Sequence, residues 1–333
     1  MVGILRYSLS HQSFHNHHQA ALFPRHGDHP SPYSTNYRTI FYNSFMTLTR
    51  KPFFSVIIPA LNEEKYLPLL LADLAKQTTR DFEVIIIDGN SKDKTVAKAK
   101  LFKNKLPLLT ILSSPVRNVS VQRNQGATKA TGRYLLFNDA DNRLPEYFLE
   151  GLRYQLHVKP LDLFTNWLNP DSTTASDKAV ASYMNIMVET ASLLNQPAAY
   201  GALIGCRKNI FNKIGGFNRE VGFAEDTEFV NRGHHKGFTF GVIREPRFVY
   251  SFRRFRKMGK LKMLQKYAVL NLKFLTNQKV DQKKEYPMGG GYLEEETRIT
   301  SDLTKLIRSA FKKGAKKTKI TDRLRALLSL EES

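Results

Sequence analysis

The chain has 333 residues, enough for one large domain or two ordinary ones, and its hydrophobic share of 41% is typical of a folded core rather than of wholesale disorder. Its net charge of +21 suits an acidic partner such as a nucleic acid or an anionic membrane, whereas a single cysteine, Cys206, excludes internal disulfides and cysteine-based metal sites. No apolar run reaches the ~18 residues of a membrane-spanning helix, so the sequence predicts a soluble or peripheral protein.

Charge and composition separate the two ends of the chain from its middle. Residues 1–50 hold six of the nine histidines and one acidic residue, Asp28, without apolar periodicity, which predicts a disordered leader. An acid-poor leader is also typical of a transit peptide, and Met46, just ahead of the first predicted strand, is an alternative start of the native protein. Residues 251–333 carry 21 of the 51 basic and 9 of the 30 acidic side chains, so the basic character belongs mainly to the C-terminal quarter.

The C-terminal region, residues 256–333, is predicted to be basic and helical. Apolar residues recur at helical intervals between Leu261 and Leu275, and residues 303–330 repeat the pattern beside many lysines. A helix with one apolar and one lysine-rich face is typical of an interfacial membrane helix. It is equally typical of a solvated helix docked on a core, and both interpretations stay open.

Residues 51–255 alternate apolar runs with helical patterns. Asn62 is expected to cap the first helix, with Glu63 and Glu64 in its first turn. The alternation with short connections predicts an α/β fold: a Rossmann-like, mostly parallel sheet flanked by helices. The predicted strands are residues 53–59, 82–88, 108–112, 134–138, 161–167, 200–206, 238–243 and 247–252. The predicted helices follow residue 62 and residue 93, span 119–131, 145–157 and 176–194, and begin again at Glu225, after a turn at 214–217.

Polar residues follow three of the predicted strands. They are the Asn62–Glu63 turn, Asp88, and the pair Asp139 and Asp141. In parallel sheets ligands bind beyond the carboxyl ends of the strands, so these groups are expected to converge. Aspartates two apart on an extended backbone point to the same side, where Mg²⁺ or Mn²⁺ prefers their oxygens. A plain acidic turn is the alternative for the pair. The phosphate-binding loops of dinucleotide-binding and P-loop proteins are absent.

Seven short motifs occur in an order and at spacings that resemble the family 2 glycosyltransferases of the GT-A fold, over roughly residues 53–255. They are Val56-Ile-Ile-Pro-Ala-Leu-Asn-Glu-Glu64, Ile87-Asp-Gly-Asn-Ser-Lys-Asp93, Arg123-Asn-Gln-Gly126, Ala130-Thr-Gly132, Asp139-Ala-Asp141, Gly215-Gly-Phe217 and Glu225-Asp226. Each motif is weak alone, whereas the ordered set is specific for the family but not for the sugar. The resemblance implies inverting transfer of a sugar from a nucleotide-diphosphate sugar to a hydroxyl acceptor.

The resemblance also implies roles for individual residues. Asp139 would approach the ribose and the metal, and Asp141 would ligate Mg²⁺ or Mn²⁺. Asp226 would be the general base, and Glu225 would bind the acceptor or orient Asp226. Arg123 would lie near the nucleotide. The nucleoside pocket would be lined by Pro59, Ala60, Leu61, Glu63 and Asp88.

Two departures from the family pattern matter. Gly89 stands where many members carry a second acidic residue, which affects recognition of the base. The Gln-x-x-Arg-Trp motif of processive synthases is absent, which favours transfer of a single sugar. Arg253 or Arg254, after the last predicted strand, is hypothesised to pair with the diphosphate, against the alternative of a solvent-exposed basic cluster.

The leading hypothesis is a glycosyltransferase at the cytoplasmic face of a membrane, peripheral to it, where basic helices contact anionic lipid near a lipid-linked or cell-envelope acceptor. A sugar-1-phosphate nucleotidyltransferase is the second hypothesis, although Pro59-Ala-Leu-Asn-Glu-Glu64 stands where a glycine-rich loop is expected. A basic nucleic-acid-binding protein is the third. No nucleic-acid motif supports it, so no specific nucleic-acid partner is expected.

Overall fold

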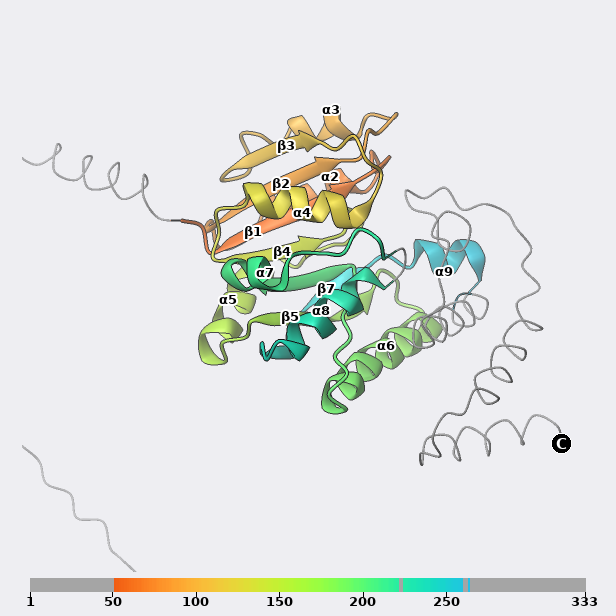
Figure 1. Cartoon of the computed structure of the whole chain (residues 1–333). Coiled ribbons are helices and arrows are strands. Elements are labelled where there is room, and N and C mark those ends of the chain that lie inside the picture. Colours follow the sequence, from red (N-terminus) through yellow and green to blue (C-terminus); the bar gives the residue numbers. More distant parts are fainter. Residues whose placement is uncertain (1–50, 222–223, 260–262, 264–333) are drawn as a thin grey trace, which may run out of the picture. The chain divides into compact units, whose positions relative to one another are not determined.

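The structure is a computed structural model that describes residues 51–221, 224–259 and 263 (Figure 1). The predicted leader, with the alternative start at Met46, lies outside the described residues. So does the basic C-terminal region beyond Gly259, apart from Met263. The fold described below therefore belongs to the middle of the chain, where the sequence places the candidate site.

Seven strands in the described part of the chain form one sheet, in the order β3-β2-β1-β4-β6-β5-β7. Strand β6 is antiparallel to its neighbours β4 and β5, and the remaining pairs are parallel. The sequence prediction of a mostly parallel α/β sheet is thus confirmed. The strands are β1 (Phe54–Ala60), β2 (Phe82–Asp88), β3 (Leu109–Ser113), β4 (Tyr134–Asn138), β5 (Leu163–Pro170), β6 (Leu203–Arg207) and β7 (Phe240–Tyr250).

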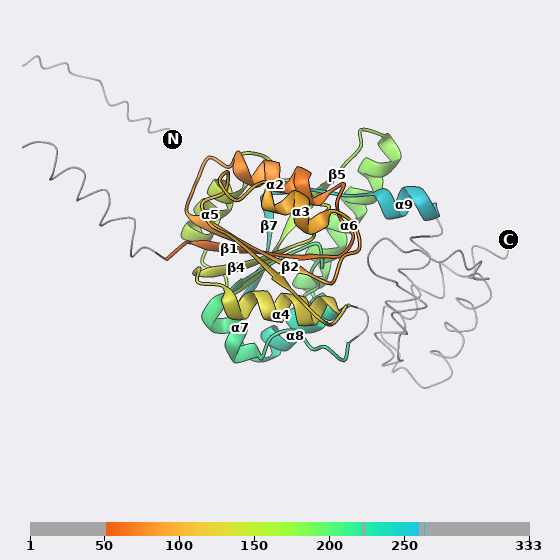
Figure 2. The same ribbon diagram turned by 90° about the horizontal axis from the view of Figure 1, so that it is seen from above.

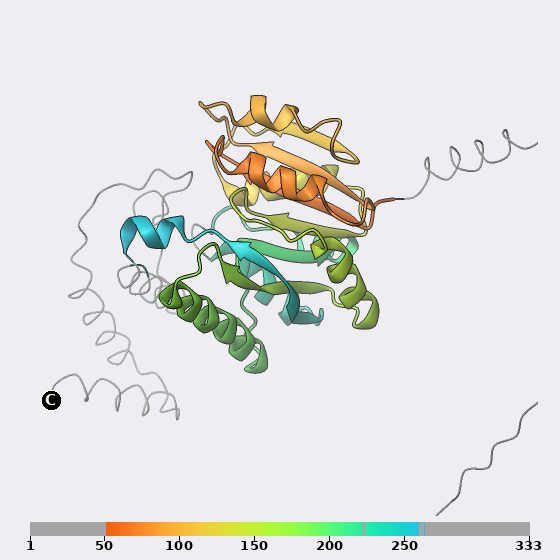
Figure 3. The ribbon, with the colours of Figure 1, turned by 180° about the vertical axis from the view of Figure 1, so that it is seen from behind.

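Helices cover both faces of the sheet, as Figure 2 shows from above. Helices α2, α3, α5, α6 and α9 pack on one face, which Figure 3 shows from behind, and α4, α7 and α8 pack on the other. The helices are α2 (Leu67–Ala75), α3 (Thr95–Lys100), α4 (Val119–Lys129), α5 (Phe148–Val158), α6 (Ala175–Leu193), α7 (Lys208–Ile214), α8 (Glu225–His235) and α9 (Arg253–Met258).

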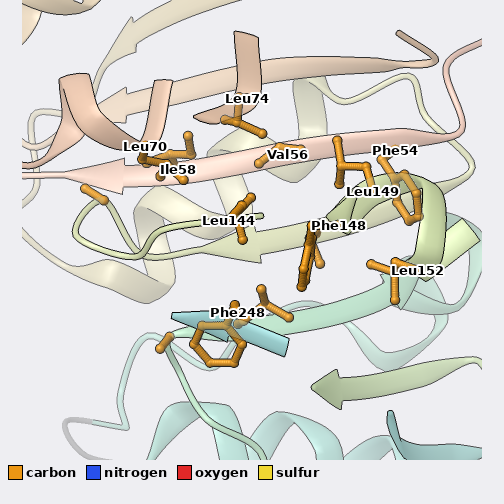
Figure 4. Close-up of a cluster of buried hydrophobic side chains, with 14 of the residues drawn as sticks. Phe54, Val56, Ile58, Leu70, Leu74, Leu144, Phe148, Leu149, Leu152 and Phe248 are labelled. Carbon is orange, nitrogen blue, oxygen red and sulfur yellow. The ribbon is translucent and has the colours of Figure 1, made fainter. Parts of the chain in front are cut away.

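Strand β1 is buried along its whole length because both of its faces are covered. Val56 and Ile58 point to one face, where Figure 4 shows Ile58 beside Leu70 and Val56 beside Leu74, both of α2, while Ile57 joins the core on the other face. This alternation follows from the two-residue period of a strand. It explains why this central parallel strand is apolar on both faces, with Ser55 as its one polar residue.

Glycine at position 205 is required by the packing of β6 against β5. Gly205 pairs with Phe164, and a Cβ atom at position 205 would lie 1.8 Å from Cζ of the buried Phe164 ring. We expect Gly205→Ala to lower the free energy of unfolding by ~1–3 kcal/mol, because the buried ring must shift to admit the Cβ atom. Urea denaturation measures this.

Gly151→Ala is the matched control, because Gly151 lies inside α5, where a Cβ atom would meet Pro246 at 3.4 Å, an ordinary contact. Alanine is favoured over glycine within a helix by ~1 kcal/mol, so this variant should be as stable as the wild type or more so. Equal stability of the Gly205→Ala variant and the wild type would show that the packing argument is wrong.

The prediction that Asn62 caps the first helix is wrong. Asn62 adopts a left-handed conformation with φ of 56°, and α2 begins five residues later, at Leu67. The Asn62 side chain instead accepts a hydrogen bond from the Lys92 backbone N–H at 2.8 Å. Asparagine tolerates the left-handed region, so the residue types that favour a cap also favour this turn.

Two other expectations differ from the structure. The segments 238–243 and 247–252 form one strand, β7, which passes through Pro246. Since β7 lies at the edge of the sheet, proline removes no hydrogen bond that the sheet needs there. Helix α7 was not anticipated. It ends at Gly215, whose φ of 94° identifies the glycine as a C-cap rather than as part of a simple turn.

Candidate active site

The site lies at the carboxyl ends of three neighbouring parallel strands. Pro59 and Ala60 end β1, Asp88 ends β2, and Asp139 and Asp141 follow β4. Since β1 pairs with both β2 and β4, the topology brings these residues to one edge of the sheet. The convergence expected from the sequence is therefore present, and α8 and α9 add residues from much later in the chain.

Arg123 on α4 joins one half of the site. Its side chain is only 2% exposed, and it contacts Asp139 at 3.4 Å and Glu225 at 2.8 Å. It also donates a hydrogen bond to the Gly201 carbonyl at 2.7 Å, and its guanidinium lies 5.2 Å from the centre of the Phe217 ring. Arg123 therefore fixes the position of the carboxylates from within the protein, rather than presenting an open charge to a ligand.

Asp226 stands next to this cluster at the start of α8. Its Oδ1 accepts a hydrogen bond from the Thr227 backbone N–H at 2.7 Å. A Cβ atom at Gly201 would lie 2.9 Å from Asp226 Oδ2, so any larger residue at position 201 would displace this carboxylate. Glu225 and Asp226 both lie in the first turn of α8, where the helix dipole favours negative charge.

Burial changes the acidity of two carboxyl groups here. It raises the pKa of Asp226 to about 7, and the adjacent charge of Glu225 acts in the same direction. Burial also raises the pKa of Asp139 to about 6, against the lowering effect of Arg123. The Asp139 side chain nevertheless keeps 37% of its surface exposed and is open to a ligand. A carboxyl group whose pKa is near 7 is suited to exchange protons at neutral pH.

Arg253, the first residue of α9, joins the other half of the site. Its terminal nitrogens contact the two carboxylate oxygens of Glu63 at 2.9 and 2.5 Å. Its Nε lies 2.9 Å from Oδ2 of Asp141, and its guanidinium stacks 4.6 Å from the centre of the Tyr66 ring. Burial raises the pKa of Glu63, and Arg253 offsets part of this effect. The structure thus brings Arg253 to the predicted site.

Asp88 has one carboxylate oxygen that accepts no hydrogen bond. Its Oδ2 accepts a hydrogen bond from the Ser91 backbone N–H at 3.1 Å, whereas its buried Oδ1 has no hydrogen-bond partner. Gln122 fixes the adjacent strand ends by donating to the carbonyls of Ala60 and Ile87. A Cβ atom at Gly89 would lie 3.1 Å from Nε2 of Gln122. Gln122 therefore stands close to where a second acidic side chain would be, which accounts for glycine at position 89.

Asp139 and Asp141 are the candidate ligands of a divalent cation. The chain turns after β4, and the Asn142 N–H donates to the Asp139 carbonyl at 3.3 Å, so the expected extended backbone is wrong. The two carboxylates contact different arginines, Arg123 and Arg253. The described residues include no group of three or more His, Cys, Asp or Glu that could hold a metal by itself. Two oxygen ligands fit Mg²⁺ or Mn²⁺ when phosphate and water supply the others.

Sequence reasoning missed Gly201 and Gln122. Residues 200–206 were predicted as a strand, and that pattern gave no sign that Gly201 packs against Asp226. Gln122 precedes Arg123 in α4, and only the position of the helix shows that its amide reaches two strand ends. No helix in the described ranges is both long and apolar enough to cross a lipid bilayer.

Comparison with known proteins gives three informative likenesses. Over 96 residues the chain is 42% identical to a PGL/p-HBAD biosynthesis glycosyltransferase of Mycobacterium bovis, a match that covers 28% of this chain and 38% of that protein. A mannosyltransferase from Pyrobaculum calidifontis, solved with GDP-Man and Mn²⁺, has a TM-score of 0.56 at 17% identity over 89% of this chain and 88% of its own. Residues 1–349 of Staphylococcus aureus TarS, solved with UDP-GlcNAc, have a TM-score of 0.50 at 20% identity. This match covers 70% of this chain and 69% of the TarS chain.

These likenesses and the sheet order show an α/β fold of the GT-A type. The sequence model of glycosyl transferase family 2 matches residues 55–180, which include the motifs at the ends of β1, β2 and β4. Over these residues the chain is similar to glycosyltransferase family 2. It spans less than half of the length of the mycobacterial relative that it matches.

Proposed function

We propose that this protein transfers one sugar from a nucleotide-diphosphate sugar to a hydroxyl acceptor, with inversion at the anomeric carbon. The observation that carries the proposal is the position of Asp226. Its carboxyl group, with a pKa of about 7, follows Glu225 in the chain, and Arg123 connects Glu225 to Asp139, which follows β4. A base close to an anionic leaving group is the arrangement that sugar transfer to a hydroxyl needs.

The donor's nucleoside would bind over the ends of β1 and β2. The unpartnered Oδ1 of Asp88 can accept a hydrogen bond from an N–H of the base. The ends of these strands are held at a fixed separation by Gln122 and by the Gly89 N–H, which donates to the Ala60 carbonyl at 2.8 Å. The wall of this pocket would be formed by Pro59, Ala60, Leu61, Glu63 and Asp88.

The diphosphate would lie beyond β4, near Asp139, Asp141 and Arg253. Asp139 would approach the ribose and a bound Mg²⁺ or Mn²⁺, and Asp141 would ligate that ion. Such an ion, when bound, neutralises charge that develops on the leaving diphosphate. The Mn²⁺ in the structure of the Pyrobaculum mannosyltransferase supports a divalent cation at this kind of site. Arg253 would pair with the phosphates through its planar, two-pronged guanidinium.

Asp226 would act as the general base. It would take the proton of the acceptor hydroxyl as the oxygen bonds to the anomeric carbon and the bond from that carbon to the diphosphate breaks. The proton would remain on the Asp226 carboxyl until it passes to solvent. Glu225, held at 2.8 Å by Arg123, raises the pKa of Asp226 and so makes it a stronger base.

The acceptor and the cellular location are further parts of the proposal. The basic region beyond α9 would hold the protein at the inner, anionic face of a membrane, peripheral to it, near a lipid-linked acceptor. Its residues lie mostly outside those described, so its support is the sequence: residues 259–333 carry 17 basic and 9 acidic side chains. Liposomes with and without anionic lipid, sedimented at low and high salt, test this part.

Product analysis tests the reaction itself. The full chain is incubated with Mn²⁺ and, in turn, UDP-, GDP- and dTDP-sugars, and the released products are separated. We expect one donor class to release a nucleoside diphosphate, because the bond from the sugar to the diphosphate breaks as the sugar passes to water, which serves as the hydroxyl acceptor in this mixture. Release of pyrophosphate from a nucleoside triphosphate and a sugar 1-phosphate would instead identify a nucleotidyltransferase and contradict the proposal.

A further inference from the structure

Arg253 contacts two carboxylates that have different roles in the proposed function. It binds both oxygens of Glu63, on the nucleoside side, and it lies 2.9 Å from Oδ2 of Asp141, the proposed metal ligand. Glu63 and Asp141 have side chains only 8% and 14% exposed, so water screens these contacts weakly. The guanidinium thus neutralises the Asp141 carboxylate, which a divalent cation would otherwise bind.

The backbone that carries Arg253 is firmly placed. Phe252 and Phe255, on either side of it, are fully buried. Arg256, one turn further along α9, binds both carboxylate oxygens of Asp171 at 2.7 Å. Movement at Arg253 is therefore expected in the side chain and not in the helix, and its long side chain can exchange one anionic partner for another without unfolding α9.

We propose that Arg253 is the counter-ion which Asp141 exchanges for the metal, and that this exchange makes metal binding depend on the donor. Without a donor, the guanidinium occupies Oδ2 of Asp141, and a second cation beside it meets electrostatic repulsion. A diphosphate supplies new acceptors for the guanidinium, which leaves Asp141 to the metal and keeps charge balance at the site. Affinities for metal and nucleoside diphosphate then rise together, since coupling between two ligands is reciprocal.

The first test uses Mn²⁺ alone and so does not depend on the proposed function. Binding of Mn²⁺ to the full chain, without nucleotide, is measured by electron paramagnetic resonance of the free ion. We expect Arg253→Ala to bind Mn²⁺ roughly tenfold more tightly than the wild type, because Asp141 and Glu63 lose their shared counter-ion. Arg253→Lys keeps the positive charge but not the fork that holds both carboxylates, so it should show a smaller gain.

Arg256→Ala is the matched control, because it removes the same charge from the same helix. Arg256 pairs with Asp171, however, and not with Glu63 or Asp141. This variant should bind Mn²⁺ like the wild type, because the buried Phe252 and Phe255 still hold α9 in place. The inference is overturned if Arg253→Ala binds Mn²⁺ no more tightly than the wild type, or if Arg256→Ala gains as much. Thermal unfolding of each variant verifies that it is folded. Should Arg253→Ala not fold, the Arg253→Lys result decides.

The second test adds UDP or GDP and rests on the proposed function. In the wild type the nucleotide should tighten Mn²⁺ binding, and in Arg253→Ala this enhancement should fall by roughly tenfold, because no guanidinium has to be moved. An enhancement of equal size in both proteins contradicts the inference. If no nucleoside diphosphate binds the wild type at all, the proposed function fails, whereas the measurement with Mn²⁺ alone still decides the role of Arg253.

Discussion

Replacing Asp226 with asparagine is expected to reduce sugar transfer, measured as kcat/KM, by about 10²- to 10⁴-fold, the usual contribution of a general base. Asparagine has the size of aspartate, and its oxygen can still accept the hydrogen bond from the Thr227 N–H that Asp226 Oδ1 accepts at 2.7 Å. Only the proton acceptor is lost. Donor affinity, measured by calorimetry, should therefore stay close to that of the wild type.

The control for Asp226→Asn is Glu228→Gln, in the same first turn of α8. Glu228 pairs with Arg232 one turn later and contacts none of the proposed site residues. Its removal should leave transfer within about twofold, because this half-buried pair lies outside the proposed site. An Asp226→Asn protein that retains wild-type turnover would exclude Asp226 as the base.

The pH profile gives the Asp226 prediction its specific signature. Burial, with the charge of Glu225, raises the pKa of Asp226 to about 7, so below that pH the carboxyl is protonated and cannot accept a proton. In the wild type kcat/KM should rise up to tenfold per pH unit below about pH 7 and level off above it. The residual activity of Asp226→Asn should lack this rise. Glu225→Gln removes a charge that raises the pKa, so it should move the rise to lower pH.

The sheet and the edge that holds the site could be predicted because local patterns determine them. β1 and β2 are mostly apolar, apart from Ser55, Glu83 and the terminal Asp88, since both of their faces are covered, and this pattern is visible in the sequence. Parallel pairing then brings Ala60 and Asp88 into register at one edge. The predicted positions of Asp88, Asp139 and Asp226 at the ends of elements followed from the same reasoning and from the family motifs.

The contacts within the site could not be predicted because they join residues far apart in the chain. Arg123 and Glu225 are separated by 102 positions, and Arg253 and Glu63 by 190. From its motif Arg123 was expected near the nucleotide, yet its side chain is only 2% exposed and is occupied by Asp139, Glu225 and a carbonyl. Whether a charged residue faces a ligand or another charged residue depends on how the elements pack. The spacing of motifs along the chain carries no information on that packing.

The same limit applies to the aspartates after β4. Two aspartates at this spacing were expected on an extended backbone, facing the same way, whereas the chain turns and each carboxylate contacts a different arginine. The turn-forming residues around them, Asn138 and Asn142, were a signal for this conformation. The pair therefore connects the two halves of the site, and its removal is expected to affect metal, donor and turnover together.

The double variant Asp139→Asn/Asp141→Asn is accordingly expected to reduce transfer by about 10³-fold, because neither side chain would carry the charge that holds a divalent cation against the diphosphate. Mn²⁺ binding in the presence of donor, followed by electron paramagnetic resonance, should be lost in parallel. The fold should persist, since Arg123 keeps Glu225 and the Gly201 carbonyl, and Arg253 keeps both oxygens of Glu63.

Asp171→Asn is the control for this double variant, because Asp171 also pairs with an arginine, Arg256, but lies outside the proposed site. It should turn over donor at close to the wild-type rate. Wild-type turnover in the Asp139→Asn/Asp141→Asn protein would contradict the proposed function at its centre. Loss of turnover with unchanged Mn²⁺ and donor binding would instead show that the two aspartates act on the reaction without holding the metal. Their negative charge, and not metal ligation, would then account for their effect on turnover.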